Sequence, residues 1–191
     1  MGAFILELIS YRELKKTEID ETLFASFNRY QDVKKCWRKE NGEWVLIDIA
    51  FTEQWGSDEY KCLVRCLQNT VETGGAVFGA FSNNLLVGFT SVESELFGSQ
   101  KEYVELKNIH TSYENRGLGI GKHLFYLACK KAKETGAEKL YISAHSSQES
   151  QAFYKAMGCV EAAEYNEKSV IAEPCDCQLE YNLQSMEDNN R

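Results

Sequence analysis

The sequence contains little proline, no long apolar run and fewer basic than acidic residues, and each shortage narrows the class of protein. Only one of the 191 residues is proline and 43% are hydrophobic, which favours a compact globular fold over a linker-rich or disordered chain. No apolar run approaches the roughly 20 residues of a transmembrane helix, so we expect no membrane partner. The length predicts a single domain over residues 1–191, with a frayed polar tail at 186–191.

Basic residues are too few for a nucleic-acid-binding surface. Lys and Arg number 21 against 29 Asp and Glu, which gives a formal net charge of −8. Because neutralising phosphates requires a basic face, nucleic acid is not expected as a partner. An acidic surface favours a cationic substrate, although solubility alone is the commoner reason for such a charge.

Signals for secretion and for metal binding are also missing. Met1–Ser10 has no basic start, so the sequence predicts no secretory signal. The seven cysteines are scattered; Cys62 and Cys66 lie one helical turn apart, and neither they nor Cys175 and Cys177 form a CxxC motif. We therefore expect free or buried thiols in a reducing cytoplasm, without a disulfide framework or a metal site.

Hydrophobic spacing and turn residues predict an α+β fold with one mixed sheet and helices on its faces. Asn41-Gly42 and Asn83-Asn84 are typical of hairpin turns, and residues 51–57 form a predicted aromatic loop. The expected helices are a stretch beginning at Thr17 and residues 58–71, 119–135 and 149–157. The expected strands are 4–11, 76–81, 85–92, 103–111, 140–144, 159–165 and 177–183, with a short hairpin that pairs 36–39 with 44–49.

The stretch from Asn108 to Leu124 contains the strongest functional signal. An expected strand ends near Thr111, a short polar loop follows, and alternating glycines at 117, 119 and 121 then lead into an amphipathic helix. Such glycines leave backbone N–H groups uncovered at a helix N-terminus, where partial positive charge is concentrated. With the permanent cation of Arg116 beside them, these groups predict a pocket for a phosphate or pyrophosphate.

Three phosphate-binding motifs compete for these glycines. A P-loop requires Ser or Thr after Gly121-Lys122, where His123 stands. A dinucleotide fingerprint requires Gly or Ala at position 124 or 122, which are Leu and Lys. The remaining pattern, [Arg/Gln]-x-x-Gly-x-[Gly/Ala], is satisfied at every fixed position by Arg116, Gly119 and Gly121.

A second block agrees with the first at a suitable distance along the chain. Leu140–His145 is followed by Ser147-x-x-Ser-x-x-Phe-Tyr154-x-x-Met-Gly158. Together the two blocks resemble the GNAT superfamily of acetyl-CoA-dependent N-acetyltransferases. The sequence departs from the family at Ser147, where asparagine is usual, and at Cys159, where phenylalanine is common. The Ser147 departure puts the side-chain contact to the CoA arm in doubt, whereas a Ser can still cap the helix.

The resemblance implies a three-layer fold with a single mixed central sheet of about six or seven strands, splayed between the strands at 103–111 and 139–144. It also implies acetyl-CoA as co-substrate. The backbone of the first of these strands would hold the thioester, the glycine loop would hold the pyrophosphate, and Tyr154 would protonate the leaving sulfur. The cofactor-binding residues implied in this way are Ile109, His110, Thr111, Arg116, Gly117, Leu118, Gly119, Ile120, Gly121, Lys122, Ser147, Ser150, Phe153 and Tyr154.

The general base is less well defined by the resemblance. Glu105 lies six residues before Thr111, where some family members carry a catalytic glutamate, and a solvated strand residue is the alternative. His110 and His145 each end a strand bordering the expected cleft and are further candidates. Many relatives use only a water relay, so a protein base is not required.

The acceptor is expected to be a primary amine on a small molecule, acetylated by direct attack in a ternary complex. As a hypothesis, an aromatic cluster walls its site and nearby acids attract a cationic amine, ordinary core and hairpin packing being the alternative. The aromatic residues are Trp37, Trp44, Phe51, Trp55 and Tyr60, and the acids are Asp48, Glu53 and Asp58. Protein N-terminal or lysine acetylation, and a non-catalytic acyl-CoA-binding module, are alternative functions, and a homodimer is left open.

Overall fold

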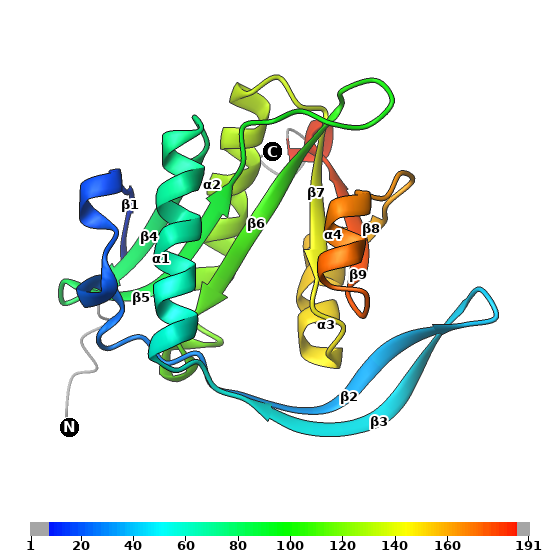
Figure 1. The fold of residues 1–191 in the computed structure, drawn as a ribbon, viewed down its shortest axis with the longest axis horizontal. Coiled ribbons are helices and arrows are strands. Elements are labelled where there is room, and N and C mark those ends of the chain that lie inside the picture. The colour runs from blue at the N-terminus through cyan, green and yellow to red at the C-terminus, as the bar shows by residue number, and fades with distance from the viewer. Residues whose placement is uncertain (1–7, 187–191) are drawn as a thin grey trace.

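A seven-stranded mixed sheet forms the centre of the computed structural model, which describes residues 8–186 (Figure 1). The strand order is β1-β4-β5-β6-β7-β9-β8, and every neighbouring pair is antiparallel except β6 and β7. The α+β class with a single central sheet is therefore confirmed. The strands are β1 Ser10–Glu13, β4 Ala76–Ser82, β5 Leu85–Val92, β6 Tyr103–Thr111, β7 Lys139–Ala144, β8 Val160–Glu161 and β9 Cys177–Asn182.

Helices cover both faces of this sheet (Figure 1). Helix α1 (Ser57–Glu72) packs on one face through a core that includes Leu67, and the short α4 (Glu167–Ala172) lies on the same side. Helices α2 (Ile120–Glu134) and α3 (Gln148–Met157) cover the other face. None of the helices within residues 8–186 is long and apolar enough to cross a bilayer.

Strands β6 and β7 separate soon after they begin to pair. Their parallel ladder contains three positions, Tyr103 with Lys139, Val104 with Leu140, and Glu105 with Tyr141. Beyond these positions β6 continues to Thr111 and β7 to Ala144 without pairing to each other. The splay predicted between these two strands is therefore confirmed, and it opens a wedge in the sheet.

A long hairpin extends away from the central sheet as a separate two-stranded sheet (Figure 1). It consists of β2 (Gln31–Glu40) and β3 (Glu43–Glu53). The turn is at Asn41-Gly42, where both φ angles are positive, 52° and 89°, as the tight hairpin turn predicted there requires. The strands are longer than predicted, since they pair from Gln31 with Glu53 to Glu40 with Glu43. Strand β2 also binds the body of the protein, where Trp37 N donates to Ser146 O at 2.8 Å.

The N-terminal helix expected from Thr17 is wrong. Two 3-10 turns, Lys16–Glu18 and Glu21–Phe24, take its place. The backbone is extended at Ile19 and Asp20, between the two turns, and the Asp20 carboxylate caps the second turn by accepting from Leu23 N at 3.0 Å. This local side-chain contact competes with a continuous helix, as is common for aspartate.

Two predicted strands differ in extent from those observed. Of the strand expected at 4–11, residues 4–7 lie outside the described part, and the observed strand β1 covers Ser10–Glu13. The strand expected at 159–165 is only β8, and the predicted loop after it contains α4. Of the predicted tail at 186–191, residue 186 ends the 3-10 turn Leu183–Met186 and the rest lies outside the described residues.

Substituting Leu67→Ala tests the core between α1 and the sheet. Leu67 is 0% exposed and packs in the cluster that also contains Phe89, so we expect the free energy of unfolding to fall by about 2–5 kcal/mol. Urea denaturation measures this change. The control is Leu85→Ala at a 55% exposed leucine, and an equal loss in both variants would contradict the assigned core.

Candidate active site

The wedge between β6 and β7 contains a cavity of about 980 Å³. Twelve of the fourteen residues expected to bind the cofactor line it, as does Glu105. The exceptions are Leu118, whose side chain is 65% exposed, and Ser147, which is buried. The two sequence blocks, far apart along the chain, thus border one space, and neither exception faces it.

The glycine loop presents open backbone at one end of this cavity. Gly117 and Gly119 have φ angles of 79° and 80°, a region that favours glycine, and a Cβ atom at either position would meet nothing within 4 Å. Helix α2 begins at Ile120, and no side chain among the described residues caps its first turn. Uncovered amides at a helix N-terminus suit the pyrophosphate group of CoA.

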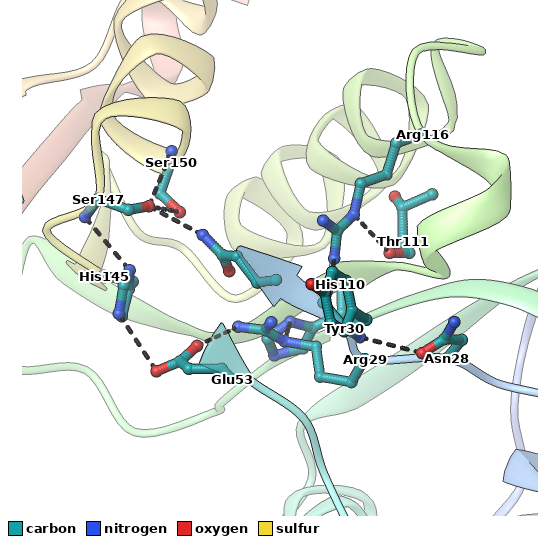
Figure 2. A network of polar contacts seen from close by, with 11 residues as sticks. Asn28, Arg29, Tyr30, Glu53, His110, Thr111, Arg116, His145, Ser147 and Ser150 are labelled. Atoms are coloured by element: carbon teal, nitrogen blue, oxygen red, sulfur yellow. Dashed lines mark hydrogen bonds and ion pairs between the residues drawn. The ribbon is translucent and has the colours of Figure 1, made fainter. Parts of the chain in front are cut away.

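Arg116 lies beside the loop but is held by the backbone. Its Nη2 donates to Tyr30 O at 2.6 Å and its Nε to Thr111 O at 3.4 Å. Figure 2 shows the guanidinium between these two segments. Burial lowers the pKa of Arg116, and Glu114 and Tyr113 partly oppose that shift. The side chain therefore links the end of β6 to the segment before β2 while lining the cavity.

Tyr154 reaches the cavity from α3 with its hydroxyl unused. The residue is buried, and no hydrogen bond between described residues involves this hydroxyl. Burial raises the pKa of Tyr154, and Cys159 and Asp176 raise it further. The phenol is therefore protonated at neutral pH and can donate a proton or hydrogen bond to a bound group.

Ser147 is used as the cap of helix α3. Its Oγ accepts from Ser150 N at 3.3 Å and from Gln31 Nε2 at 3.0 Å, and it donates to Ser150 Oγ at 2.9 Å. Serine thus replaces the family's usual asparagine as a helix cap. Because these contacts occupy its hydroxyl, the structure adds no support for the predicted contact between Ser147 and the cofactor.

A chain of polar contacts crosses the wedge from β6 to α3 (Figure 2). Arg29 Nε donates to His110 Nδ1 at 3.1 Å, and Arg29 Nη2 contacts Glu53 Oε2 at 3.2 Å. Glu53 Oε1 lies 3.3 Å from His145 Nε2, and His145 Nδ1 accepts from Ser147 N at 3.2 Å. The hairpin thereby connects the ends of the two separated strands.

This chain leaves both candidate histidines poorly suited to act as bases. The Nδ1 lone pair of His110 is occupied by Arg29. Burial, then the charges of Arg29, Arg116 and His145, hold the pKa of His110 well below its ordinary value. The two ring nitrogens of His145 are engaged by Glu53 and Ser147. Each ring lies at the predicted position, but neither offers a free basic nitrogen.

Glu105 occupies the closed end of the wedge. It is the last residue of β6 that pairs with β7. Its Oε1 forms an ion pair with Lys107 at 3.2 Å and accepts from Ser169 Oγ at 3.1 Å. The side chain lines the cavity, but a cation and a hydroxyl of α4 already hold it.

Two of the residues expected to wall the acceptor site line the cavity, namely Trp55 and Glu53. The other aromatic residues do not line it. Trp37, Trp44 and Phe51 lie farther along the hairpin than Glu53, and the Tyr60 hydroxyl donates to Phe27 O at 2.7 Å. Asp48 and Asp58 are exposed and pair with neighbouring lysines. The hypothesis of a wider acidic and aromatic wall is therefore not supported for Trp37, Trp44, Phe51, Tyr60, Asp48 and Asp58, none of which lines the cavity.

Arg29, Gln31 and Asp176 line the cavity although no sequence pattern singled them out. Arg29 is buried against Trp55, with its guanidinium carbon 5.3 Å from the ring centre, and its Nη1 has no partner among the described residues. Of the three, only Asp176 could have been placed near a strand end from sequence, because it directly precedes the strand predicted at 177–183. Within residues 8–186 no three His, Cys, Asp or Glu side chains group as a metal site.

The sequence profile of the Acetyltransferase (GNAT) family matches residues 24–159. The chain belongs to the GNAT acetyltransferase family. No curated protein sequence matches it. As a GNAT acetyltransferase the protein uses acetyl-CoA as its co-substrate, and the uncapped glycine loop is a suitable place for the pyrophosphate of that molecule.

Solved structures share this fold at low sequence identity. Nourseothricin acetyltransferase is 18% identical with a TM-score of 0.63, over 90% of this chain and 95% of its own. A protein described as a streptothricin acetyltransferase, from Bacillus anthracis str. Ames in complex with acetyl coenzyme A, is 16% identical with a TM-score of 0.67, over 92% and 98%. The PaiA N-acetyltransferase of Thermoplasma acidophilum, with coenzyme A, is 16% identical with a TM-score of 0.56, over 92% and 99%.

The depressed pKa of His110 predicts an acid-sensitive contribution to stability. His110 stays neutral in the folded protein, whereas in the unfolded chain it takes up a proton below its ordinary pKa of about 6.5. The free energy of unfolding therefore includes the full contribution of neutral His110 above pH 6.5. That contribution is lost as the pH falls below 6.5, by at most about 1.4 kcal/mol per pH unit.

We expect His110→Gln to remove this part of the pH dependence while leaving an oxygen that can accept from Arg29. Urea denaturation of both proteins between pH 7.5 and pH 5 measures the difference. Parallel stability–pH curves for the two proteins would show that His110 is not held neutral.

Proposed function

We propose that this GNAT acetyltransferase transfers the acetyl group of acetyl-CoA to a primary amine on a small molecule, by direct attack in a ternary complex. One observation carries the proposal: the glycine loop, the unused Tyr154 hydroxyl and the Arg29–Glu53 pair border a single cavity. Donor and acceptor can therefore meet in one cavity, as direct transfer requires.

The donor side of the cavity supplies backbone donors and side chains of α3. We assign the pyrophosphate to the amides of residues 117–121, next to Arg116 and Lys122, and the pantetheine arm to the β7-facing backbone of residues 109–111, left unpaired by the splay. Phe153 and Ser150 line the same space from α3. Backbone N–H groups aimed at the thioester carbonyl would stabilise the negative charge that develops on its oxygen.

The acceptor side favours a small molecule over a protein. Its wall comes from residues at the base of the hairpin, Arg29, Gln31, Glu53 and Trp55, and these lie in the same cavity as the donor loop. Two proteins of similar fold are described as a nourseothricin acetyltransferase and a streptothricin acetyltransferase. Both observations support a polar, amine-bearing acceptor of low molecular mass.

The acceptor class is tested by measuring acetyl-CoA consumption with a panel of amines. The panel contains streptothricin, aminoglycosides, polyamines, amino acids and peptides, and mass spectrometry locates the added acetyl group. We expect acetylation of an amino group on at least one small molecule. Acetylation of peptides alone would overturn the small-molecule assignment, and O-acetylation would overturn the amine.

Tyr154→Phe tests the proposed general acid. Removing the hydroxyl should lower kcat about 100-fold and leave the dissociation constant of acetyl-CoA nearly unchanged, because the ring and its packing remain. Steady-state kinetics and isothermal titration calorimetry measure the two quantities. The control is Tyr181→Phe, a buried tyrosine of the same core cluster that does not line the cavity; unchanged turnover in Tyr154→Phe would exclude Tyr154 as the acid.

Gly119→Asp tests the pyrophosphate site. A carboxylate beside the uncapped helix should weaken acetyl-CoA binding about 100-fold or more, since juxtaposed like charges cost several kcal/mol. Gly42→Asp is a matched control, because its φ of +89° resembles the +80° of Gly119 and a Cβ atom at either position meets open space. Equal affinities in the two variants would place the pyrophosphate elsewhere.

A further inference from the structure

Asp176, one of five carboxylates that line the cavity, enters it from the position just before β9. Asp176 directly precedes Cys177, which pairs with Ala144 at the end of β7. It therefore lies toward the open end of the wedge, whereas Glu105 lies at the closed end. Asp176 lines the cavity together with Ser143 and Tyr154, and its charge acts on the Tyr154 hydroxyl.

Among the described residues, the Asp176 carboxylate forms no ion pair. Its Oδ2 accepts from Ser143 Oγ at 3.2 Å, which is its only hydrogen bond from a side chain or backbone donor in this part of the chain. Of the other carboxylates that line the cavity, Glu105 pairs with Lys107 and Glu53 with Arg29, whereas Glu149 and Glu173 are exposed to solvent. Asp176 is thus the half-buried carboxylate of the cavity whose negative charge is left for a ligand.

The groups around Asp176 favour a proton acceptor that works near neutral pH. Burial raises the pKa of Asp176 to about 6, with Glu173 and Glu53 adding to the shift and His145 and Ser143 opposing it. The remaining ionisable neighbours are Tyr154 on α3 and Cys177 on β9, both protonated because burial raises their pKa. A base is most effective when its pKa lies close to the working pH.

We propose that Asp176 binds the ammonium group of the acceptor and takes its proton before the attack on acetyl-CoA. This role rests on the proposed function and narrows it to acceptors that carry an alkylammonium group at neutral pH. Asp176 then replaces Glu105 as the catalytic base. Glu105, already paired, remains at the closed end of the wedge.

In this role Asp176 and Tyr154 carry out the proton transfers of the reaction. The ammonium gives one proton to Asp176, and the free amine forms the new C–N bond at the thioester carbonyl carbon. When the tetrahedral intermediate collapses, the C–S bond breaks and Tyr154 protonates the sulfur. The nitrogen returns a proton to Tyr154, and Asp176 releases its proton to solvent. Each acetyl transfer yields one amide, one CoA thiol and one proton.

The test compares pH profiles of kcat/KM between pH 5 and pH 9, with streptothricin as the first acceptor and otherwise the amine acetylated fastest in the panel. The variants are Asp176→Asn and Glu105→Gln, and Glu173→Gln controls for the loss of a neighbouring carboxylate. We expect the wild type and Glu105→Gln to lose activity as the pH falls through about 6, and Glu173→Gln to do so at a lower pH, because the charge of Glu173 raises the pKa of Asp176. We expect Asp176→Asn to be at least about 100-fold slower and to lack this acidic limb, with Asp176→Glu recovering part of the rate.

Two further measurements separate this role from a structural one and from the proposed function. Calorimetry should show unchanged acetyl-CoA affinity in Asp176→Asn. Carbon-13 NMR of Asp-labelled wild type should contain a carboxyl resonance that titrates near pH 6 and is missing from Asp176→Asn.

A retained acidic limb in Asp176→Asn, its loss in Glu105→Gln, or a labelled Asp176 carboxyl with an ordinary pKa would each overturn the role of Asp176 alone. Wild-type protein that binds acetyl-CoA but acetylates no amine would instead overturn the proposed function.

Discussion

The short parallel pairing between β6 and β7 is the feature on which the rest of the site depends. Three paired positions join the strands, and the sheet is then open between Glu105 and the strand ends. Backbone N–H and C=O groups that would hydrogen-bond across a complete β6–β7 pairing are thereby left free to bind a ligand. The same divergence places the glycine loop after β6 and the polar residues after β7 on opposite sides of one cavity.

An open sheet requires other contacts to fix the distance between its two halves. Helix α2 packs across the sheet beneath the wedge, and the Arg29–Glu53 pair joins His110 on one side to His145 on the other (Figure 2). Buried polar chains of this kind hold a geometry well only when their members are paired. The base of the hairpin therefore both lines the cavity and connects the separated strands.

Local sequence was sufficient to place the glycine loop and Tyr154 at the cavity, and insufficient to place the hairpin residues and Asp176 there. The glycine loop and Tyr154 lie in contiguous blocks, where spacing alone defines a strand end, a helix start and one helix face. The contact between Glu53 and His145 joins residues far apart in the chain, through a hairpin whose course no local pattern specifies. Asp176 comes shortly after α4, a short helix that the sequence did not predict. Its position in the cavity, beside Ser143 of β7 and Ala172 of α4, could therefore not be derived from its neighbours in sequence.

The central claim, that the wedge binds both reactants, is tested most directly by a crystal structure with acetyl-CoA bound. Our account predicts the pyrophosphate within hydrogen-bonding distance of the amides of residues 117–121. It also predicts the thioester between β6 and β7, with its sulfur within about 3.5–4 Å of the Tyr154 hydroxyl. A pyrophosphate bound away from the glycine loop, or a thioester outside the wedge, would contradict it.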